Sequence, residues 1–197
     1  MLSWLGEQDF SMIWAAFTLA FFCFLHCSEF TYQGVSKFHP RFDLLANCVL
    51  FHPSLASPWQ MSIILKSSKT DVFWEGHRLL IVCSPSPLCT VTAMHSYFLA
   101  TCPRGPLFSF QSGRYLTRSA VVHLLRDAAR YASLPYKSLK GHSFCIGAAS
   151  TAAAAGLPDW LTKVLGRWSS DCYQLYIRTP QNVLLSAVPR MASVLFS

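Results

Sequence analysis

The sequence lacks several patterns that would assign it to a common structural class. Its 8 cysteines include no Cys-x-x-Cys pair, and no histidine stands at zinc-finger spacing from a pair of cysteines, so the usual structural zinc modules are excluded. It has no internal repeat and no low-complexity tract beyond the alanines of 152–155. Disorder is also disfavoured, because hydrophobic residues make up 52% of the 197 positions and can fill a core.

A membrane-length apolar run is missing as well. The most apolar segment, 12–25, is shorter than the roughly 20 residues that span a bilayer. Glu7 and Asp9 precede it, where a signal peptide would carry a basic region. We therefore expect a helix over 10–25 that is buried in the core, and no membrane partner. A small protein anchored through 12–25 is the alternative, and partitioning into detergent would favour it.

Cysteine usage indicates the compartment. An even number of cysteines could form disulfides in a secreted protein, but most of them lie within apolar runs, as buried thiols do. We therefore expect a reducing compartment, and a nuclear or intracellular protein that is not secreted.

Acidic residues are scarce in the second half of the chain. Residues 1–100 hold 5 Lys and Arg against 6 Asp and Glu, whereas residues 101–197 hold 11 against 3. A basic half beside a neutral half suggests a surface that faces a polyanion, and a merely solvated basic surface is the alternative.

The elements that the sequence does predict form one α+β domain over 1–197 that is mainly helical. Alternating and β-branched residues predict strands at 59–65 and 77–83. The segment 31–58 is expected to be irregular, with a short strand near 31–35 as an open alternative. Further helices are expected at 93–101 and after Thr117, where apolar residues recur at helical spacing.

Residues 139–180 predict three short helices joined by tight turns. Ser143 is the expected N-cap of an alanine-rich helix that Gly156 ends. Pro158 can start the second helix, which Gly166 closes. Ser169 or Ser170 is expected to cap a third helix, which carries two tyrosines, Tyr173 and Tyr176.

Four short motifs stand in order along the chain. The first is Leu25-His26-Cys27-Ser28-Glu29-Phe30, and the second is Lys66-Ser67-Ser68-Lys69-Thr70-Asp71 between the two expected strands. The third is His142-Ser143-Phe144-Cys145, and the fourth is Leu165-Gly166-Arg167-Trp168, with Tyr176 nine residues after Arg167. In order and spacing, this set resembles the catalytic core of the tyrosine recombinases, the phage-integrase superfamily. The likeness is strongest to the recombinases of DIRS-like and Crypton-like mobile elements.

The resemblance implies an enzyme that breaks and rejoins double-stranded DNA through a 3′-phosphotyrosine link, without a metal or a small-molecule cofactor. It implies that Tyr176 is the nucleophile, with Tyr173 as the rival, and that Lys69 is the general acid. His142 would lie beside the phosphate, and Arg167 or Trp168 would take the place of the third-box His or Trp. Glu29 would be structural, holding backbone or basic groups nearby.

Basic residues near these motifs are the candidates for contacts to the DNA backbone, although a solvated helix face explains the arginines of the 118–130 helix equally well. They are Lys140, Lys163, Arg118, Arg126 and Arg130.

Both positions where the resemblance expects a phosphate-binding arginine hold another residue, namely His26 and Cys145. A histidine is mostly neutral near pH 7, and a thiol is a weak, uncharged donor. We therefore expect little strand cleavage, with Arg167 as a partial replacement if it turns toward the phosphate. A non-catalytic module that reuses the fold to bind DNA or another protein is the alternative.

The resemblance covers about 10–180 and leaves out the N-terminal helical domain that closes the clamp around DNA in family members. The tail 181–197 is a candidate contact to a second copy, and a packed C-terminal helix is the default. Arg→His and Arg→Cys each need one C→T or G→A transition in a CGN codon. We therefore expect a decaying transposable-element copy in a host genome.

Overall fold

The computed structural model describes residues 5–66, 76–178, 185 and 189. In these residues the fold is α+β and mainly helical, with a small antiparallel sheet, as expected from the sequence. The α-helices are α1 (Glu7–Phe22), α2 (Cys27–Phe30), α3 (Thr90–Thr101), α4 (Arg118–Tyr131), α5 (Ser143–Ala154) and α6 (Asp159–Leu165). The strands are β1 (Val49–His52), β2 (Gln60–Leu65) and β3 (His77–Val82). The 3₁₀ helices are η1 (Val35–Lys37), η2 (Ala46–Cys48) and η3 (Asp171–Tyr176).

Helix α1 is the centre of the larger core, which confirms the expected buried helix. Its alanines Ala15 and Ala16 and its Leu19 are fully buried, and the helix packs against α3 and α5. Gly147 of α5 leaves room for the Phe21 ring, since a Cβ at that position would lie 3.0 Å from it. Among the described residues, no helix is both long enough and apolar enough to cross a membrane.

The sheet has the order β1-β2-β3, and both pairs of strands are antiparallel. Strands β2 and β3 confirm the prediction, and Leu65 pairs with His77 at the end that leads into 67–75. Strand β1 was missed, so the irregular interpretation of 31–58 was wrong there. Its 4 residues are too few to show a period of two, and pairing with β2 is what makes them extended.

The short strand considered near 31–35 is not formed. Tyr32 makes one isolated bridge to Thr117, and a 3₁₀ turn follows at η1. The Tyr32 hydroxyl instead donates to the Leu44 carbonyl at 2.6 Å inside the core. A buried tyrosine needs such a partner, so this contact fixes the path of the loop.

Helix α4 begins as expected, because the Thr117 hydroxyl accepts a hydrogen bond from the Ala120 amide at 3.2 Å. Val121 and Leu124 are buried, whereas Arg118, His123 and Arg130 are exposed. The isolated bridge from Thr117 to Tyr32 holds the start of this helix on the larger core.

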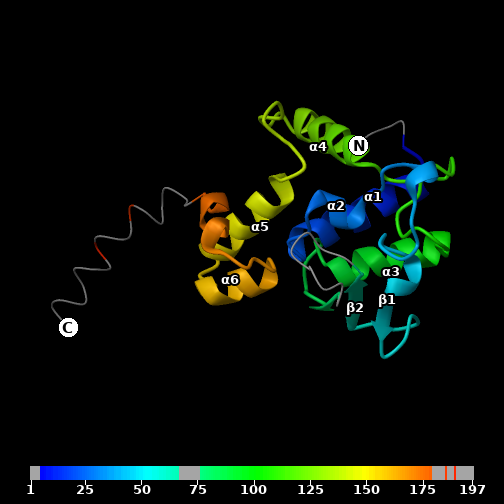
Figure 1. Cartoon of the computed structure of the whole chain (residues 1–197), viewed down its shortest axis with the longest axis horizontal. Helices are drawn as coiled ribbons and strands as arrows, with labels where there is room; N and C mark the ends of the chain where they lie inside the picture. The colour runs from blue at the N-terminus through cyan, green and yellow to red at the C-terminus, as the bar shows by residue number, and fades with distance from the viewer. Residues whose placement is uncertain (1–4, 67–75, 179–184, 186–188, 190–197) are drawn as a thin grey trace.

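Helix α5 and the η3 turn, together with Phe24 and Trp168, build a second, smaller core. Figure 1 shows α5 and α6 to the side of α1–α3 and the sheet. Gly156 follows α5 with a φ of +74°, so the expected glycine terminator is confirmed. Two details differ from the prediction. His142 stands at the N-cap of α5, while the Ser143 hydroxyl accepts from the Lys140 amide at 2.9 Å. The third helix is a 3₁₀ helix, whose N-cap Ser170 makes no side-chain capping bond.

The end of α6 is a Schellman turn in which the left-handed position holds an arginine. The Trp168 amide donates to the Lys163 carbonyl at 3.1 Å, and the Arg167 amide to the Val164 carbonyl at 3.0 Å. Gly166 has a φ of −81°, whereas Arg167 has a φ of +56°. A residue with a Cβ is strained there, so its side chain must make contacts that offset the cost.

Candidate active site

One pocket, of about 390 Å³, gathers most of the motif residues. It lies where the end of the α1–α2 turn, the start of α4, the start of α5 and the segment 168–176 meet. Among residues 5–66 and 76–178, its lining residues include no aspartate or glutamate. They are His26, Cys27, Ser28, Arg118, Gly141, His142, Trp168, Ser169, Ser170 and Tyr176. The pocket is therefore rich in hydrogen-bond donors and suited to an anion.

Tyr176 lies between two of these residues. Its ring is 6.5 Å from the His142 ring and nearly parallel to it, and 5.9 Å from the Trp168 ring. Its own carbonyl accepts a hydrogen bond from the Ser150 hydroxyl at 3.1 Å, which ties the end of η3 to α5. The backbone is thus fixed while the half-buried side chain lines the pocket.

The rival tyrosine has a different environment. Tyr173 is only 2% exposed and stacks on Trp168 at 5.5 Å within the smaller core. It is not among the residues that line the pocket. Of the two tyrosines, Tyr176 is therefore the one that lines the pocket.

Trp168 has an unsatisfied donor. The residue is 7% exposed, and its indole Nε1 is buried without a hydrogen-bond partner in the described part of the chain. A buried N–H without an acceptor costs roughly 1–3 kcal/mol, so this indole nitrogen is a destabilising feature of the residue that lines the pocket. Trp168 packs against Gly166 and Phe24, which hold its ring in place.

The two histidines of the pocket lie next to each other, with ring centroids 5.9 Å apart. His142 is exposed at the N-cap of α5, and the half-buried His26 is the N-cap of α2. The His26 amide donates to Glu29 Oε2 at 2.7 Å, so the carboxylate fixes the start of α2.

Cys145 is fully buried behind His26. Its Sγ lies 3.6 Å from His26 Nδ1 and donates to the Leu25 carbonyl at 3.3 Å. Burial raises the pKa of this thiol to about 12, with the Glu29 carboxylate acting in the same direction. The sulfur therefore stays protonated and carries no charge at neutral pH.

Arg167 does not line the pocket; its guanidinium is held elsewhere. It donates to Glu29 Oε2 at 2.8 Å and to the Cys23 carbonyl at 3.0 Å, and the two side chains are only 7% and 3% exposed. These contacts at the C-terminal end of α1 explain why an arginine occupies the left-handed position. They also confirm the expected structural role of Glu29, which holds a backbone amide and a basic group.

Lys69, the expected general acid, lies outside the described residues. The strands that flank it are described, and Lys66 at the end of β2 donates from Nζ to the Pro40 carbonyl at 2.8 Å.

The candidate DNA-binding residues fall into different environments. Arg118 lines the pocket, and Lys140 is exposed beside it in sequence. Arg126 is half-buried and donates from Nε to the Leu139 carbonyl at 3.0 Å. The other two are ion-paired: Arg130 with Asp127 at 3.3 Å, and Lys163 with Asp171 at 2.7 Å. Of the five, the structure brings only Arg118 to Tyr176.

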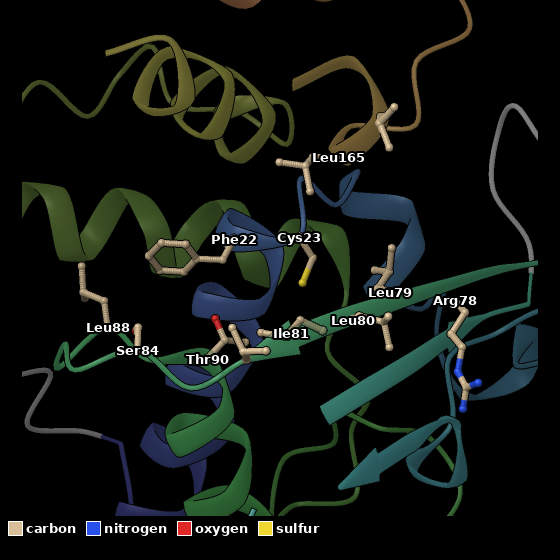
Figure 2. Close-up of a pocket in the computed structure, with 12 residues that line it drawn as sticks. Phe22, Cys23, Arg78, Leu79, Leu80, Ile81, Ser84, Leu88, Thr90 and Leu165 are labelled. Carbon is tan, nitrogen blue, oxygen red and sulfur yellow. The ribbon is translucent and has the colours of Figure 1, made fainter. Parts of the chain in front are cut away.

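A second pocket, of about 500 Å³, has no comparable chemistry. Figure 2 shows Phe22, Leu79 and Leu165 around this mostly apolar space between the end of α1, strand β3 and α6. Cys23 at its base has a pKa raised to about 12 by burial, so it is not a reactive thiol. The described residues also hold no group of three or more ligands that could bind a metal ion.

Searches against protein-family models and against curated proteins find no match to this sequence. Similarity appears at the level of structure. The XerH site-specific recombinase bound to palindromic difH substrate, in a post-cleavage complex, aligns with a TM-score of 0.68 at 12% identity, over 93% of this chain and 46% of that chain. Its pre-cleavage complex aligns with a TM-score of 0.63 at 12% identity, over 93% and 48% of the two chains.

A Flpe mutant in a DNA Holliday junction complex aligns with a TM-score of 0.53 at 14% identity, over 86% of this chain and 40% of that chain. The chain thus spans less than half the length of these recombinases. The likeness shows that the chain has the fold of a tyrosine recombinase catalytic domain.

Proposed function

We propose that this chain is a DNA-binding domain of the tyrosine recombinase superfamily, whose pocket holds a backbone phosphate of duplex DNA beside Tyr176. The observation that carries the proposal is that Tyr176, His142 and Trp168 line one pocket, which has no acidic side chain among its described lining residues. The fold neighbours agree with it, since their structures contain a difH substrate or a DNA Holliday junction.

The reaction that this pocket would support is phosphoryl transfer to tyrosine. The Tyr176 oxygen forms a bond to phosphorus, the bond from phosphorus to the 5′ oxygen breaks, and a 3′-phosphotyrosine link results. His142 would accept the hydroxyl proton, and Lys69 would donate a proton to the departing 5′ oxygen. The Trp168 indole would donate to a phosphate oxygen as negative charge develops.

We also propose that cleavage is weak. His26 and Cys145 offer no guanidinium, and the Cys145 thiol is neutral because its pKa is raised to about 12. Arg167, the expected replacement, is occupied by Glu29 and by helix carbonyls. Loss of one preorganised donor costs about 10²–10³ in rate, and loss of two charged forks is expected to cost at least as much.

A covalent trap tests both parts of the proposal. A library of nicked duplexes of random sequence is incubated with the full chain, and the adduct is isolated under denaturing conditions. We expect binding to duplex DNA that falls steeply with salt, and a trace of adduct that Tyr176→Phe abolishes but Tyr173→Phe preserves. Rapid adduct formation would refute the impairment, and an adduct that survives in Tyr176→Phe would refute the assignment of the nucleophile.

The alternative, a module that binds DNA without cutting it, predicts salt-dependent binding and no adduct at all. Absence of duplex binding at low salt would contradict both versions.

Restoring the arginines distinguishes loss of activity from a different function. Cys145 is fully buried and its sulfur is 3.6 Å from His26, so a longer side chain at 145 needs the space that His26 fills. We therefore expect Cys145→Arg alone to destabilise the domain, and His26→Arg with Cys145→Arg to increase adduct formation by at least 100-fold. The increase must disappear when Tyr176→Phe is added.

The tail 181–197 is proposed to contact a second copy of the chain. Its apolar residues support this, and Leu185, one of its two described residues, is 69% exposed. Light scattering of the full chain and of a chain ending at 180 tests the idea. A mass above that of a monomer, lost on truncation, is the expected result, and equal monomeric masses would refute it.

We further propose that the chain derives from a transposable element of the DIRS-like or Crypton-like kind and acts in the nucleus. The described cysteines whose side chains are placed are all free thiols, which fits a reducing compartment. A TGY codon at 145 and a CAY codon at 26 would support decay from arginine codons, and fluorescence microscopy of the tagged chain tests the nuclear location.

A further inference from the structure

Arg118 stands on a part of the fold that is fixed. It is the first residue of α4, directly after the N-cap Thr117, whose hydroxyl accepts from the Ala120 amide. The preceding Leu116 is fully buried in the larger core, and its carbonyl accepts from the Tyr32 amide at 2.9 Å. The exposed side chain therefore starts from a well-determined position.

The Arg118 guanidinium packs against the backbone of Gly141, just before the start of α5. A Cβ added to Gly141 would lie 3.0 Å from Arg118 Nε and 3.2 Å from Nη2, and 3.3 Å from the Cβ of Cys27. The guanidinium thus lies between the start of α2 and the start of α5, the same two segments that bring His26 and His142 to the pocket. Glycine at 141 is what permits this approach.

The charge on Arg118 is not neutralised within the pocket. No carboxylate is among the lining residues, and in residues 5–66 and 76–178 no hydrogen bond or ion pair is formed by this guanidinium. The nearby Glu29 is already paired with Arg167 at 2.8 Å. Burial raises the pKa of the Cys27 thiol and Arg118 opposes that rise, which agrees with a positive charge close to the pocket wall.

Trp168, a lining residue of the same pocket, also has a donor that lacks an acceptor. Its Nε1 is buried, and it has no partner in the described part of the chain. The Arg118 guanidinium, which lacks a carboxylate partner among the described residues, would be satisfied by a tetrahedral anion in the pocket.

We propose that Arg118 binds the phosphate that Tyr176 faces, and so supplies the guanidinium that neither His26 nor Cys145 can offer. The proposal rests on the proposed function and gives Arg118 a specific role, in place of a general contact to the DNA backbone. A guanidinium binds two phosphate oxygens in a planar fork, which a histidine or a thiol cannot do. The affinity for phosphate would then depend on Arg118. Cleavage would still be slow, because positions 26 and 145 lack the arginines that would stabilise the transition state.

Inorganic phosphate is a probe that tests this site without DNA. The Trp168 indole N–H resonance in a ¹⁵N-correlated NMR spectrum reports binding, once Trp168→Phe has assigned it. We expect phosphate to shift this resonance in a saturable way, and Arg118→Ala to weaken the apparent affinity by about tenfold or more. Arg118→Lys is expected to retain part of the affinity, because it keeps the charge and loses the fork.

Arg114→Ala is the matched control. Arg114 is also exposed and lies four residues before Arg118, but it does not line this pocket. The Arg114→Ala variant should bind phosphate with the same affinity as the parent chain. The proposal is overturned if phosphate fails to shift the Trp168 resonance or if Arg118→Ala binds phosphate as tightly as the parent. It is also overturned if Arg114→Ala loses as much affinity for phosphate as Arg118→Ala does.

Duplex binding and the covalent trap, measured on the same variants, separate this inference from the proposed function. Phosphate binding that depends on Arg118, in a chain that does not bind duplex DNA, would leave the anion site standing and refute the DNA function. A Tyr176 adduct that is unaffected by Arg118→Ala would keep the DNA function and refute the role of Arg118.

Discussion

Arg167 and Glu29 form the most buried of the ion pairs among the described residues, with side chains 7% and 3% exposed. The pair has a structural consequence, because it connects the turn after α6 to the end of α1 and the start of α2. A buried pair is costly to break from one side, since the remaining charge then has no partner in a region that excludes water.

Arg167→Met is therefore expected to lower the free energy of unfolding by about 3–5 kcal/mol, even though the Arg167 side chain does not line the pocket. Urea denaturation measures the change. Adding Glu29→Gln should recover most of the loss, because no unpaired carboxylate remains. Arg130→Ala, which breaks an exposed pair with Asp127, should cost about 1 kcal/mol or less.

The buried thiols Cys23 and Cys145 predict how stability changes with pH. Burial raises the pKa of both to about 12, above the ordinary value of 9.0. Above pH 9 the unfolded chain loses these protons while the folded chain keeps them, so the free energy of unfolding falls as pH rises from 9 toward 12. Denaturation at pH 7, 9 and 10 checks this. Cys145→Ala should make the decline shallower, and an equally steep decline would contradict the assignment.

At the scale of elements, the turn after α6 depends on a missing side chain at Gly166. A Cβ at this position would lie 2.1 Å from the Trp168 ring, which is closer than any real contact. The glycine is thus required by the ring that packs on it, and the left-handed position next to it is filled by Arg167.

Gly166→Ala is expected to displace the Trp168 ring and to cost about 1–3 kcal/mol, as overpacking does. Near-ultraviolet circular dichroism and urea denaturation detect the two effects. Gly6→Ala is the control, because its nearest neighbour would be 3.9 Å away and its φ of −64° suits any residue. If Gly166→Ala behaved like this control, the proposed packing of Trp168 would be wrong.

Local signals in the sequence predicted most elements, because caps and turn residues act over a few positions. Thr117 begins and Gly156 ends a helix where expected, and the buried helix predicted over 10–25 is observed as Glu7–Phe22. Strand β1 was not predictable in this way, since its partners in β2, 8 to 14 residues further along the chain, determine its conformation. Arg167 was misjudged as available to a phosphate, because the partner that occupies it, Glu29, is distant in sequence.

The candidate site was predicted only in part. Motif spacing pointed to Tyr176, His142 and Trp168, which the structure brings together in one pocket. The sequence assigned Arg118 to a helix face that could follow DNA. Helical periodicity shows on which face of a helix a side chain lies, but not which distant segment of the chain packs beside it. The proximity of Arg118 to Gly141 depends on how α4 crosses the start of α5.

At the scale of the whole molecule, two cores of unequal size meet at the pocket. The larger is built around α1, α3 and the sheet, and the smaller has seven buried residues, of which three are alanines. Since alanine buries little apolar surface, the smaller core is expected to be the less stable of the two.

Native-state hydrogen exchange should therefore differ between the two cores. Amides of α1 and α3 are expected to exchange through global unfolding, with rates that depend strongly on denaturant. Amides of η3, which carries Tyr173 of the smaller core, are expected to exchange through local opening that depends weakly on denaturant. Equal protection and equal denaturant dependence in both sets would show a single cooperative unit.

The position of the pocket at this junction links occupancy to cooperativity. His26 follows the α1 end of the larger core, whereas Trp168 and Tyr176 belong to or pack on the smaller one. An anion bound between them must dissociate before the smaller core can separate. As the ligand saturates the pocket, local opening of η3 would then become rarer, and the two cores would unfold together.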